Sequence, residues 1–425
     1  MINHQAQERI VASRFGSHFF KPLYDSYNFV QIPQIVRSLF GLAEKPFSAE
    51  ELPPLAEEYQ HIVVLFTDSF GWRFFERFSE HPFVKRIIDQ GAVSMLTSQF
   101  PSTTAAHVTT IHTGLPLVQS GVYEWFYYEP QLDRIFAPLL FSYAGDAERE
   151  TLREAGIAPE KFFPNQTIYQ ELTEARGIDS FVFQSVSYAQ SSYSRVITKG
   201  AQLRPFYTLA EAIVELTNQL RTNQNRTYSL LYFDTIDTIC HIYGPDSPFV
   251  EAEILNYLNS LEALLHPRLQ RTSGPTLLML ISDHGHASVN PNTTVYLNRE
   301  VPQIKAMLRT NRRGRPLVPA GSARDFFLYV QDAYLDDAHE LLNHTLGGKA
   351  EVHRTADLLS GGFFGNVHPS RVLLDRMADL VILPYNGQSV WWYEADRFRM
   401  RHRGSHGGLT AEELLTPLML LPYGG

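Results

Sequence analysis

Three features that commonly reveal where a protein works are scarce in this sequence. Cysteine occurs once, at Cys240, so no disulfide can form within the chain. Apolar runs such as LLYFDTI and TLLMLIS are far shorter than the roughly 20 residues that span a bilayer. The opening residues, MINHQAQERIVASRF, lack the apolar segment of a signal peptide. These absences predict a cytoplasmic protein with no membrane partner.

An excess of positive charge is also missing. The 36 Lys and Arg residues are outnumbered by 45 Asp and Glu residues, which gives a net charge of -9. No broad basic field is therefore available to bind duplex nucleic acid, and a polyanionic ligand would need a local positive centre. Since 44% of the 425 residues are hydrophobic, the chain can bury a large core.

Short apolar runs recur along the chain and end in small or polar residues, and amphipathic segments of helical length separate most of them. This alternation predicts an α/β fold with a mostly parallel central sheet that helices cover on both faces. Ligands of such sheets bind beyond the carboxyl ends of the strands. The strand-like runs are 61–69, 92–98, 180–186, 228–235, 276–285, 378–384 and 415–422.

Residues 291–370 have a different character. They contain a basic segment, RTNRRGRP, a strand-like DFFLYVQ, a helix-like AYLDDAHELLNHTL and a Gly-rich SGGFFG. We expect a small α+β insertion that caps a catalytic core made of residues 1–290 and 371–425. The segment up to about residue 55 mixes aromatic residues with proline, which predicts irregular structure packed on the core.

Acidic and imidazole side chains follow several of the predicted strands. Asp68 comes directly after HIVVLFT, where a carboxylate suits a metal ion, although helix N-capping is the commoner role of such a residue taken alone. Asp283, His284 and His286 follow the most apolar run of the chain. A buried carboxylate beside imidazoles is costly unless a metal ion or hydrogen bonds satisfy it. The cluster therefore favours a metal site.

Two further segments carry candidate ligands. Asp237 and His241 are four residues apart in YFDTIDTICHIYGPDS, so on a helix they share one face and can hold a cation, or form an ordinary surface pair. His406 precedes two glycines in RHRGSHGGLTAEELL, which implies a tight turn, and Thr410 with Glu413 fits a capping box. Cys240 is interpreted as a small core residue.

A possible nucleophile lies in FPSTTAAHVTTIHTGLP, which reads as an extended stretch followed by a helix that Gly114 ends. Thr103 and Thr104 fall in the first helical turn, where unpaired N–H groups and the helix dipole favour an anion. A threonine hydroxyl needs a base or a metal ion to react near neutral pH. The alternative role for Ser102 or Thr103 is simple capping.

Taken together, these residues supply three carboxylates, three imidazoles and one hydroxyl, enough for two divalent ions. Mixed Asp/His ligation without cysteine suits zinc, with manganese or iron as alternatives. The set consists of Asp68, Thr104, Asp237, His241, Asp283, His284 and His406.

The order and context of these segments resemble the type I phosphodiesterase/nucleotide pyrophosphatase branch of the alkaline phosphatase superfamily. That family's nucleophile lies in a Pro-Thr-Lys-Thr-Phe-Pro-Asn-His type segment that ends in Thr-Gly-Leu, and counting back from Thr113-Gly114-Leu115 reaches Thr104. Its Asp-x-x-Gly-His-x-x-Gly-Pro segment is similar to residues 237–245. Its Ser-Asp-His-Gly is similar to residues 282–285, and its late His-Gly to residues 406–407.

The resemblance implies one metal ion on Asp237, His241 and His406, and a second on Asp68, Asp283, His284 and the Thr104 oxygen. It also implies attack by Thr104 on phosphorus, a covalent phosphothreonine intermediate, and hydrolysis of that intermediate by water. His107 stands where the family usually has an asparagine that donates to a phosphate oxygen. We expect His107 to take that role, the alternative being a histidine that faces solvent. Cys240 stands where glycine is usual.

The implied substrate is a small phosphate ester or nucleotide, cleaved at a phosphodiester or pyrophosphate bond. Alternatives are a phosphonoacetate hydrolase-like C–P hydrolase, a phosphomonoesterase, a phosphomutase and an inactive binding relative. Two divalent ions with three aspartates leave a charge of about +1, which suits a monoanionic diester. Extra positive charge for a dianion could come from Arg195, Lys199, Arg204 or RTNRRGRP, and Tyr123, Trp125 and Tyr127 could stack on a base or belong to the core.

Overall fold

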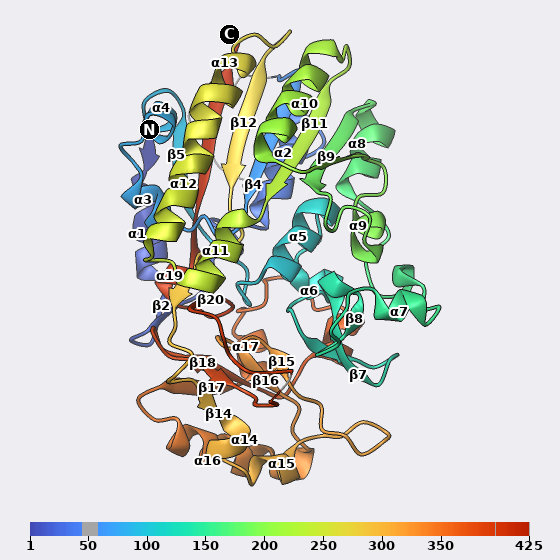
Figure 1. Cartoon of the computed structure of the whole chain (residues 1–425), viewed down its shortest axis with the longest axis vertical. Helices are drawn as coiled ribbons and strands as arrows, with labels where there is room; N and C mark the ends of the chain where they lie inside the picture. Colours follow the sequence, from blue (N-terminus) through green and yellow to red (C-terminus); the bar gives the residue numbers. More distant parts are fainter. Residues whose placement is uncertain (45–57, 396, 425) are drawn as a thin grey trace.

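An eight-stranded sheet forms the centre of the molecule in the computed structural model, which describes residues 1–44, 58–395 and 397–424. Its strand order is β1-β5-β21-β12-β4-β11-β9-β10 (Figure 1). Neighbouring strands are parallel except at β21, which runs antiparallel to both β5 and β12. The strands are β1 (Ile2–Asn3), β4 (His61–Thr67), β5 (Ala92–Thr97), β9 (Asp179–Ser185), β10 (Gln202–Phe206), β11 (Thr227–Phe233), β12 (Thr276–Ile281) and β21 (Leu415–Tyr423).

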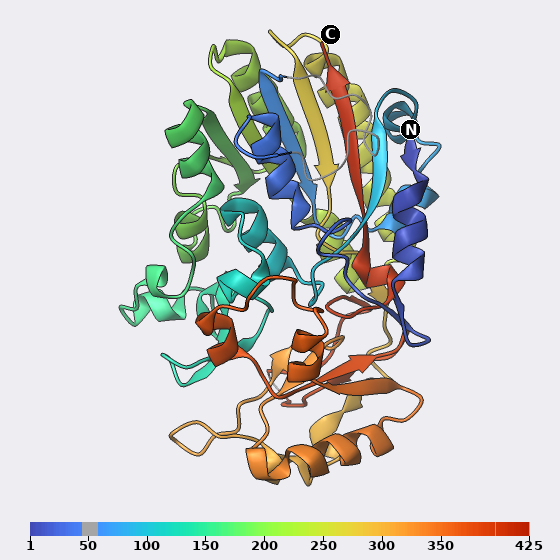
Figure 2. The ribbon, with the colours of Figure 1, turned by 180° about the vertical axis from the view of Figure 1, so that it is seen from behind.

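Helices cover both faces of this sheet, as the sequence predicts. Strands β4 and β12 are buried along their whole length, which is why they read as continuous apolar runs. Helices α10, α12 and α13 lie in front of the sheet in Figure 1, and α1, α2 and α5 lie in front of it in Figure 2. The predicted α/β class is confirmed.

The helices of this part of the chain are α1 (His4–Ala12), α2 (Gln31–Leu39), α3 (Trp72–Arg77), α4 (Pro82–Gln90), α5 (Thr104–Thr113), α6 (Leu117–Ser120), α7 (Thr151–Glu154), α8 (Ile168–Arg176), α9 (Ser192–Ile197), α10 (Leu209–Thr222), α11 (Thr235–Tyr243), α12 (Pro248–Ser260), α13 (His266–Leu269) and α19 (Ala411–Leu414). A π-helical turn, η3 (Leu261–Leu265), joins α12 to α13, and η1 (Pro138–Leu140) and η2 (Pro159–Lys161) are 3-10 turns.

The N-terminal segment is more regular than predicted. It contains the edge strand β1 and the helices α1 and α2, and the apolar face of α2 is buried through Ile32, Ile35 and Val36. The prediction of irregular structure is wrong for this part because tertiary burial, and not local propensity, decides short helices. Residues 45–55 of the same prediction lie outside the described residues.

A second sheet, β15-β16-β18-β17, is antiparallel and lies below the carboxyl ends of the central strands in Figure 1. With its neighbours it forms a cap, whose elements are β14 (Val295–Tyr296), α14 (Leu297–Glu300), α15 (Ile304–Met307), β15 (Ala320–Gly321), β16 (Phe326–Leu328), η4 (Asp332–Tyr334), α16 (Leu335–Thr345), β17 (Ala350–Arg354), α17 (Thr355–Ser360), α18 (Arg371–Arg376), β18 (Leu380–Pro384) and β19 (Val390–Trp391).

The run 378–384 therefore belongs to the cap, as strand β18, and not to the core where the sequence analysis puts it. Val381 pairs with Phe327 on one side and with His353 on the other. An apolar run shows that a strand is buried but not which sheet it joins, so the boundary predicted at residue 370 falls inside the cap. Strand β19 pairs with β14, so the cap extends at least to Trp391.

Two buried ion pairs tie the cap to the core. Arg324 makes two hydrogen bonds to Glu413, of 2.9 and 2.8 Å, and both side chains are fully buried. Arg376 pairs with Glu129 at 2.7 Å in the same way. Because Glu413 is used by Arg324, the predicted capping box is absent, and the Thr410 hydroxyl donates to the Glu413 carboxylate instead. Removing one partner of such a pair leaves an uncompensated buried charge, which costs about 3–5 kcal/mol.

Short strands complete the described structure: β2 (Arg14–Phe15), β3 (Phe19–Phe20), β6 (Tyr127–Glu129), β7 (Arg134–Ala137), β8 (Ser142–Tyr143), β13 (Ala287–Ser288) and β20 (Gly404–Ser405). Among the described residues, no helix has both the length and the apolar character needed to cross a membrane.

Candidate nucleophile and metal site

Thr104 is the first residue of α5 and lines a cavity together with the cap residues Gly321 and Trp391. The preceding residue, Thr103, is the N-cap but makes no side-chain capping bond, and the Ser102 hydroxyl donates to the carbonyl of Gly408. Neither residue therefore has the simple capping role considered above. The first N–H groups of the helix are thus left without a side-chain cap beside the Thr104 hydroxyl, the arrangement that favours an anion at a helix start.

Two of the predicted carboxylates, at the ends of β4 and β12, lie beside the histidine that contacts this hydroxyl. Asp68 and Asp283 are buried and flank His284, whose Nε2 lies 3.5 Å from Asp68 Oδ1, 3.3 Å from Asp283 Oδ2 and 3.1 Å from Thr104 Oγ1. Ser69 has a positive φ of 64°, and its N–H donates to Asp283 while its hydroxyl donates to Asp237. Ser69, whose backbone is strained, thus links the carboxylates of Asp283 and Asp237 by hydrogen bonds.

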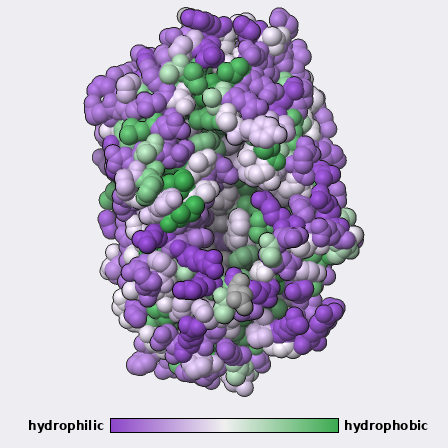
Figure 3. Space-filling view, viewed as in Figure 1, coloured by the Kyte–Doolittle hydropathy of each residue, from purple (hydrophilic) through white to green (hydrophobic). Residues whose placement is uncertain are grey.

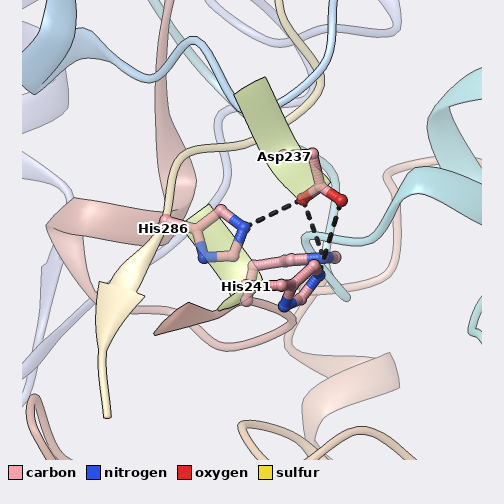
Figure 4. Close-up of side chains that lie close together, drawn as sticks. Asp237, His241 and His286 are labelled. Carbon is pink, nitrogen blue, oxygen red and sulfur yellow. Dashed lines mark hydrogen bonds and ion pairs between the residues drawn. The ribbon is translucent and has the colours of Figure 1, made fainter. Parts of the chain in front are cut away.

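A second cluster adjoins the first and is built around Asp237 (Figure 4). Asp237 and His241 project from α11, with His241 Nε2 3.5 Å from Asp237 Oδ2. His406 follows β20, and its Nε2 lies 3.7 Å from Asp237 Oδ1. His286 joins them and donates through Nε2 to Asp237 Oδ1 at 2.8 Å. His286 follows the same predicted strand as Asp283 and His284 but is absent from the ligand set predicted from the sequence.

The hydrogen bonds of the four imidazoles separate His286 from the other three. In His241, His284 and His406 the Nδ1 atom lies 2.9 to 3.1 Å from a backbone carbonyl, of Gly404, Gly285 and Ser102 respectively. Such a bond fixes the proton on Nδ1 and leaves the Nε2 lone pair free for a ligand. In His286, Nε2 is occupied by Asp237. We therefore expect His286 to orient the carboxylate of Asp237 and not to bind a metal ion.

The electrostatics of the two clusters fit a pair of cations. Burial raises the pKa of Asp283 to about 7, and burial followed by repulsion from Asp283 and Asp237 raises the pKa of Asp68 well above its usual value. Burial opposes ionisation of Asp237 as well, but the neighbouring imidazoles, His241 first, bring its pKa below the usual range. Asp283 Oδ2 is buried and accepts no hydrogen bond from the described residues. A divalent ion would offset the repulsion between the carboxylates and would give Asp283 Oδ2 a partner.

His107 does not occupy the place predicted for it. Its ring is fully buried, Nδ1 donates to the Thr103 carbonyl at 2.7 Å, and Nε2 accepts the Gln99 N–H at 2.9 Å. Burial lowers its pKa to about 3. Both ring nitrogens are bonded within the protein, so the predicted donation to a phosphate oxygen is not supported, and the histidine does not face solvent either. Cys240 is a buried core residue, as predicted.

Two cavities meet at Thr104, and the face of the molecule in Figure 3 is hollowed near its middle, between the central sheet and the cap. The smaller, of about 220 Å³, is on the Asp68 side, and its aromatic wall consists of Trp125, Tyr188, Tyr193 and Tyr232. The larger, of about 480 Å³, is on the side of His241 and His406. Trp125 lines both. Tyr123 and Tyr127 are fully buried, so of the three aromatic residues considered for stacking only Trp125 is available.

Positive charge near Thr104 comes from arginines other than those named above for a dianionic substrate. Arg195, Lys199, Arg204 and the segment 309–316 line neither cavity. The larger cavity is instead lined by Arg397, Arg399 and Arg401, and Arg149 lines the smaller one. The sequence RMRHR at residues 399–403 already indicates solvated or substrate-facing arginines, and two of them line the larger cavity.

Glu124, which lines the larger cavity, forms a buried pair of carboxyl groups with Asp325. The two groups are hydrogen-bonded to each other, and burial raises the pKa of both, that of Asp325 to about 8. Glu124 Oε1 and Asp325 Oδ2 have no donor among the described residues, so a shared proton is needed between them. A Cβ atom on Gly407 would lie 2.3 Å from Asp325 Oδ1, which explains the glycine after His406.

The fold is similar to that of several solved structures. Murine ectonucleotide pyrophosphatase/phosphodiesterase 5 is similar with a TM-score of 0.62 and 17% identity over 86% of this chain and 88% of that chain. An inactive form of that protein in complex with AMP gives a TM-score of 0.62 and 17% identity over 85% and 87%. Phosphonoacetate hydrolase from Sinorhizobium meliloti 1021, in complex with phosphonoacetate, gives 0.58 and 16% over 84% and 89%. The comparison with curated proteins gives no match.

Residues 62–409 match the family described as type I phosphodiesterase / nucleotide pyrophosphatase. The chain belongs to this family, as its motifs predict, and family membership places it among the phosphoryl hydrolases.

Proposed function

We propose that the protein is a two-metal hydrolase that cleaves phosphodiester or nucleotide pyrophosphate bonds through a phosphothreonine on Thr104. The observation that carries this proposal is the position of the Thr104 hydroxyl, at the uncapped start of α5 and 3.1 Å from His284 Nε2, where the two Asp/His clusters meet. One ion would be held by Asp237, His241 and His406, and the other by Asp68, Asp283, His284 and Thr104. Zinc suits these donors, with manganese or iron as alternatives.

When bound, two divalent ions favour ionisation of the hydroxyl and stabilise the departing oxygen. Thr104 Oγ1 then attacks phosphorus, the bond to the leaving oxygen breaks, and the first N–H groups of α5 bind a phosphate oxygen. Because His284 Nε2 would be a ligand of the ion, the hydroxyl proton would leave to water as Thr104 ionises. Water then cleaves the Thr104–phosphorus ester. His286 has a positioning role, since it holds the carboxylate of Asp237.

A phosphonate hydrolase is the second candidate. The arginines of the larger cavity favour it, because guanidinium groups bind carboxylates as well as phosphates. The similarity to phosphonoacetate hydrolase is of the same order as that to the phosphodiesterase.

The test is hydrolysis of bis-p-nitrophenyl phosphate, p-nitrophenyl phosphate and phosphonoacetate by the purified chain, with metal analysis of the same sample. About two divalent ions per chain and a higher kcat/KM for the diester than for the monoester are expected, because the site carries a charge of about +1 before Thr104 ionises. A clear preference for the monoester would contradict the diesterase assignment. If the protein released phosphate from phosphonoacetate but hydrolysed neither nitrophenyl ester, the phosphonate hydrolase would replace the diesterase assignment.

A further inference from the structure

The larger of the two cavities at Thr104 differs from the smaller one in its charge. Residues 397–401 form one stretch of its wall, in the sequence Arg-Phe-Arg-Met-Arg, and the Phe398 ring packs edge to face against Phe126. Phe398 and Met400 are buried, whereas the three arginines are exposed. Alternation of this kind anchors the segment by its apolar side chains and holds three guanidinium groups at the cavity.

The three arginines are not equally engaged. Arg397 is fixed to the protein, because Nε donates to the Gly145 carbonyl and Nη2 to the Ala144 carbonyl, both at 3.0 Å. Arg399 and Arg401 make no side-chain hydrogen bond or ion pair with any residue that the structure describes. Two guanidinium groups are thus available at a cavity that also contains the Thr104 hydroxyl.

Acidic groups in the same wall do not neutralise them. Glu124 is held in the proton-sharing pair with Asp325. Asp237 belongs to the candidate metal cluster. Asp146 accepts hydrogen bonds from the Thr151 hydroxyl and the Tyr143 N–H. It is the one carboxylate of the described lining outside the pair and the metal cluster, and three arginines of the lining stand against it. In the smaller cavity, by contrast, Arg149 lies beside Asp234, whose pKa it lowers against the larger effect of burial.

We propose that Arg399 and Arg401 form a subsite for a second anionic group of the substrate, separate from the phosphorus atom that Thr104 attacks. This inference rests on the proposed function and narrows it to substrates whose second group is a phosphate or a carboxylate. Both are planar or tetrahedral oxyanions that a guanidinium group binds with two hydrogen bonds. A cavity of about 480 Å³ lies within the usual size of a small-ligand site.

The experiment compares the wild type with Arg399→Gln/Arg401→Gln and with a control, Arg312→Gln/Arg313→Gln. The control removes the same charge from the exposed part of the cap, away from both cavities. Three substrates are used: bis-p-nitrophenyl phosphate, which has no second anionic group; diadenosine tetraphosphate, which offers phosphates; and phosphonoacetate, which offers a carboxylate. The measured quantity is kcat/KM for each anionic substrate divided by kcat/KM for bis-p-nitrophenyl phosphate.

One of the two ratios should fall at least about tenfold in Arg399→Gln/Arg401→Gln, given the strength of charge-assisted hydrogen bonds, and stay at the wild-type value in the control. The ratio that falls identifies phosphate or carboxylate as the group bound. Unchanged ratios, or an equal fall in the control, would overturn the subsite.

A binding measurement tests the anionic subsite independently of the proposed hydrolytic function. ADP carries one phosphate more than AMP, so the calorimetric affinity for ADP relative to AMP, measured with Thr104→Ala present in every protein to prevent hydrolysis, should fall about tenfold in the Arg399→Gln/Arg401→Gln variant alone. If the wild type hydrolyses none of the three substrates, the proposed function fails, while an ADP preference that depends on these arginines would still support the anionic subsite. Equal ADP and AMP affinities in the wild type and both variants would refute it.

Discussion

Thr104 is the residue on which the proposed chemistry depends. Thr104→Ala should lower hydrolysis of bis-p-nitrophenyl phosphate by about three orders of magnitude, because it removes the attacking oxygen. The thermal midpoint and metal content should change little, since alanine is tolerated at a helix start. Thr104→Ser should keep part of the activity. An inactive Thr103→Ala together with an active Thr104→Ala would mean that the nucleophile has been placed one residue too late.

The division of ligands between two ions is testable by metal analysis of single variants. Asp237→Ala and His406→Ala should each lose mainly one ion, and Asp68→Ala and Asp283→Ala mainly the other, because each pair lies in a different Asp/His cluster. Retention of about one ion per chain is the expected result in each case. Loss of both ions in all four variants would show that the clusters act as a single site.

The sequence reveals most residues of the two clusters because each follows a strand within a short motif. The roles of His107 and His286 depend on information that no motif carries. His107 is one helical turn from Thr103, and only the folded chain shows that its two nitrogens are bonded to backbone groups. His286 is two residues beyond His284, but its bond to Asp237 spans 49 positions. Hydrogen bonds between residues far apart in the chain therefore decide whether a histidine binds a metal ion or only orients a residue that does.

The Glu124–Asp325 pair, which joins the segment after α6 to the start of β16, should make stability depend on pH. Burial raises the pKa of Asp325 to about 8, so the folded state holds a proton that the unfolded chain releases near pH 4. Its favourable contribution is complete below about pH 4 and is lost as the pH rises through about 8. Asp325→Asn keeps a donor without titrating, so its thermal midpoint relative to the wild type should increase between pH 5 and pH 9, by several degrees.

Asp332→Asn, at an exposed position of η4, is the matched control and should show no such pH trend. A constant difference between Asp325→Asn and the wild type from pH 5 to pH 9 would contradict the shared proton.

At the level of strands, the apolar runs predict the position of most elements but not their partners. Seven runs read as strands, and the run 378–384 pairs in the cap because its neighbours are Phe327 and His353 rather than core residues. Helices α1 and α2 escape detection because an N-terminal segment rich in aromatic residues is ordered by the core beneath it. Which strands pair with each other depends on three-dimensional packing, so the periodicity of apolar residues along the chain does not predict it.

The whole molecule should lose stability when metal ions are removed. Buried carboxylates at Asp68 and Asp283 repel each other without a cation, and an ion that binds only the folded state at 100 times its Kd contributes about 2.7 kcal/mol. Chelation should therefore abolish hydrolysis and lower the thermal midpoint by about 5 °C or more. Zinc, manganese and iron, added back singly, should restore both to different degrees. Full activity and an unchanged midpoint after complete metal removal would refute the metal-dependent mechanism.

The position of β21 in the central sheet also affects the order in which the sheet can assemble while the chain is synthesised. Leu415–Tyr423 is the last strand along the described sequence, yet it lies between β5 and β12. While a ribosome is still making the cap, β5 and β12 each have an open hydrogen-bonding edge, and His406 has not yet been added to its cluster. Open edges attract strands of other chains. The nascent chain thus exposes two open strand edges until β21 is made, and the closed sheet and the complete candidate site are then acquired in the same step.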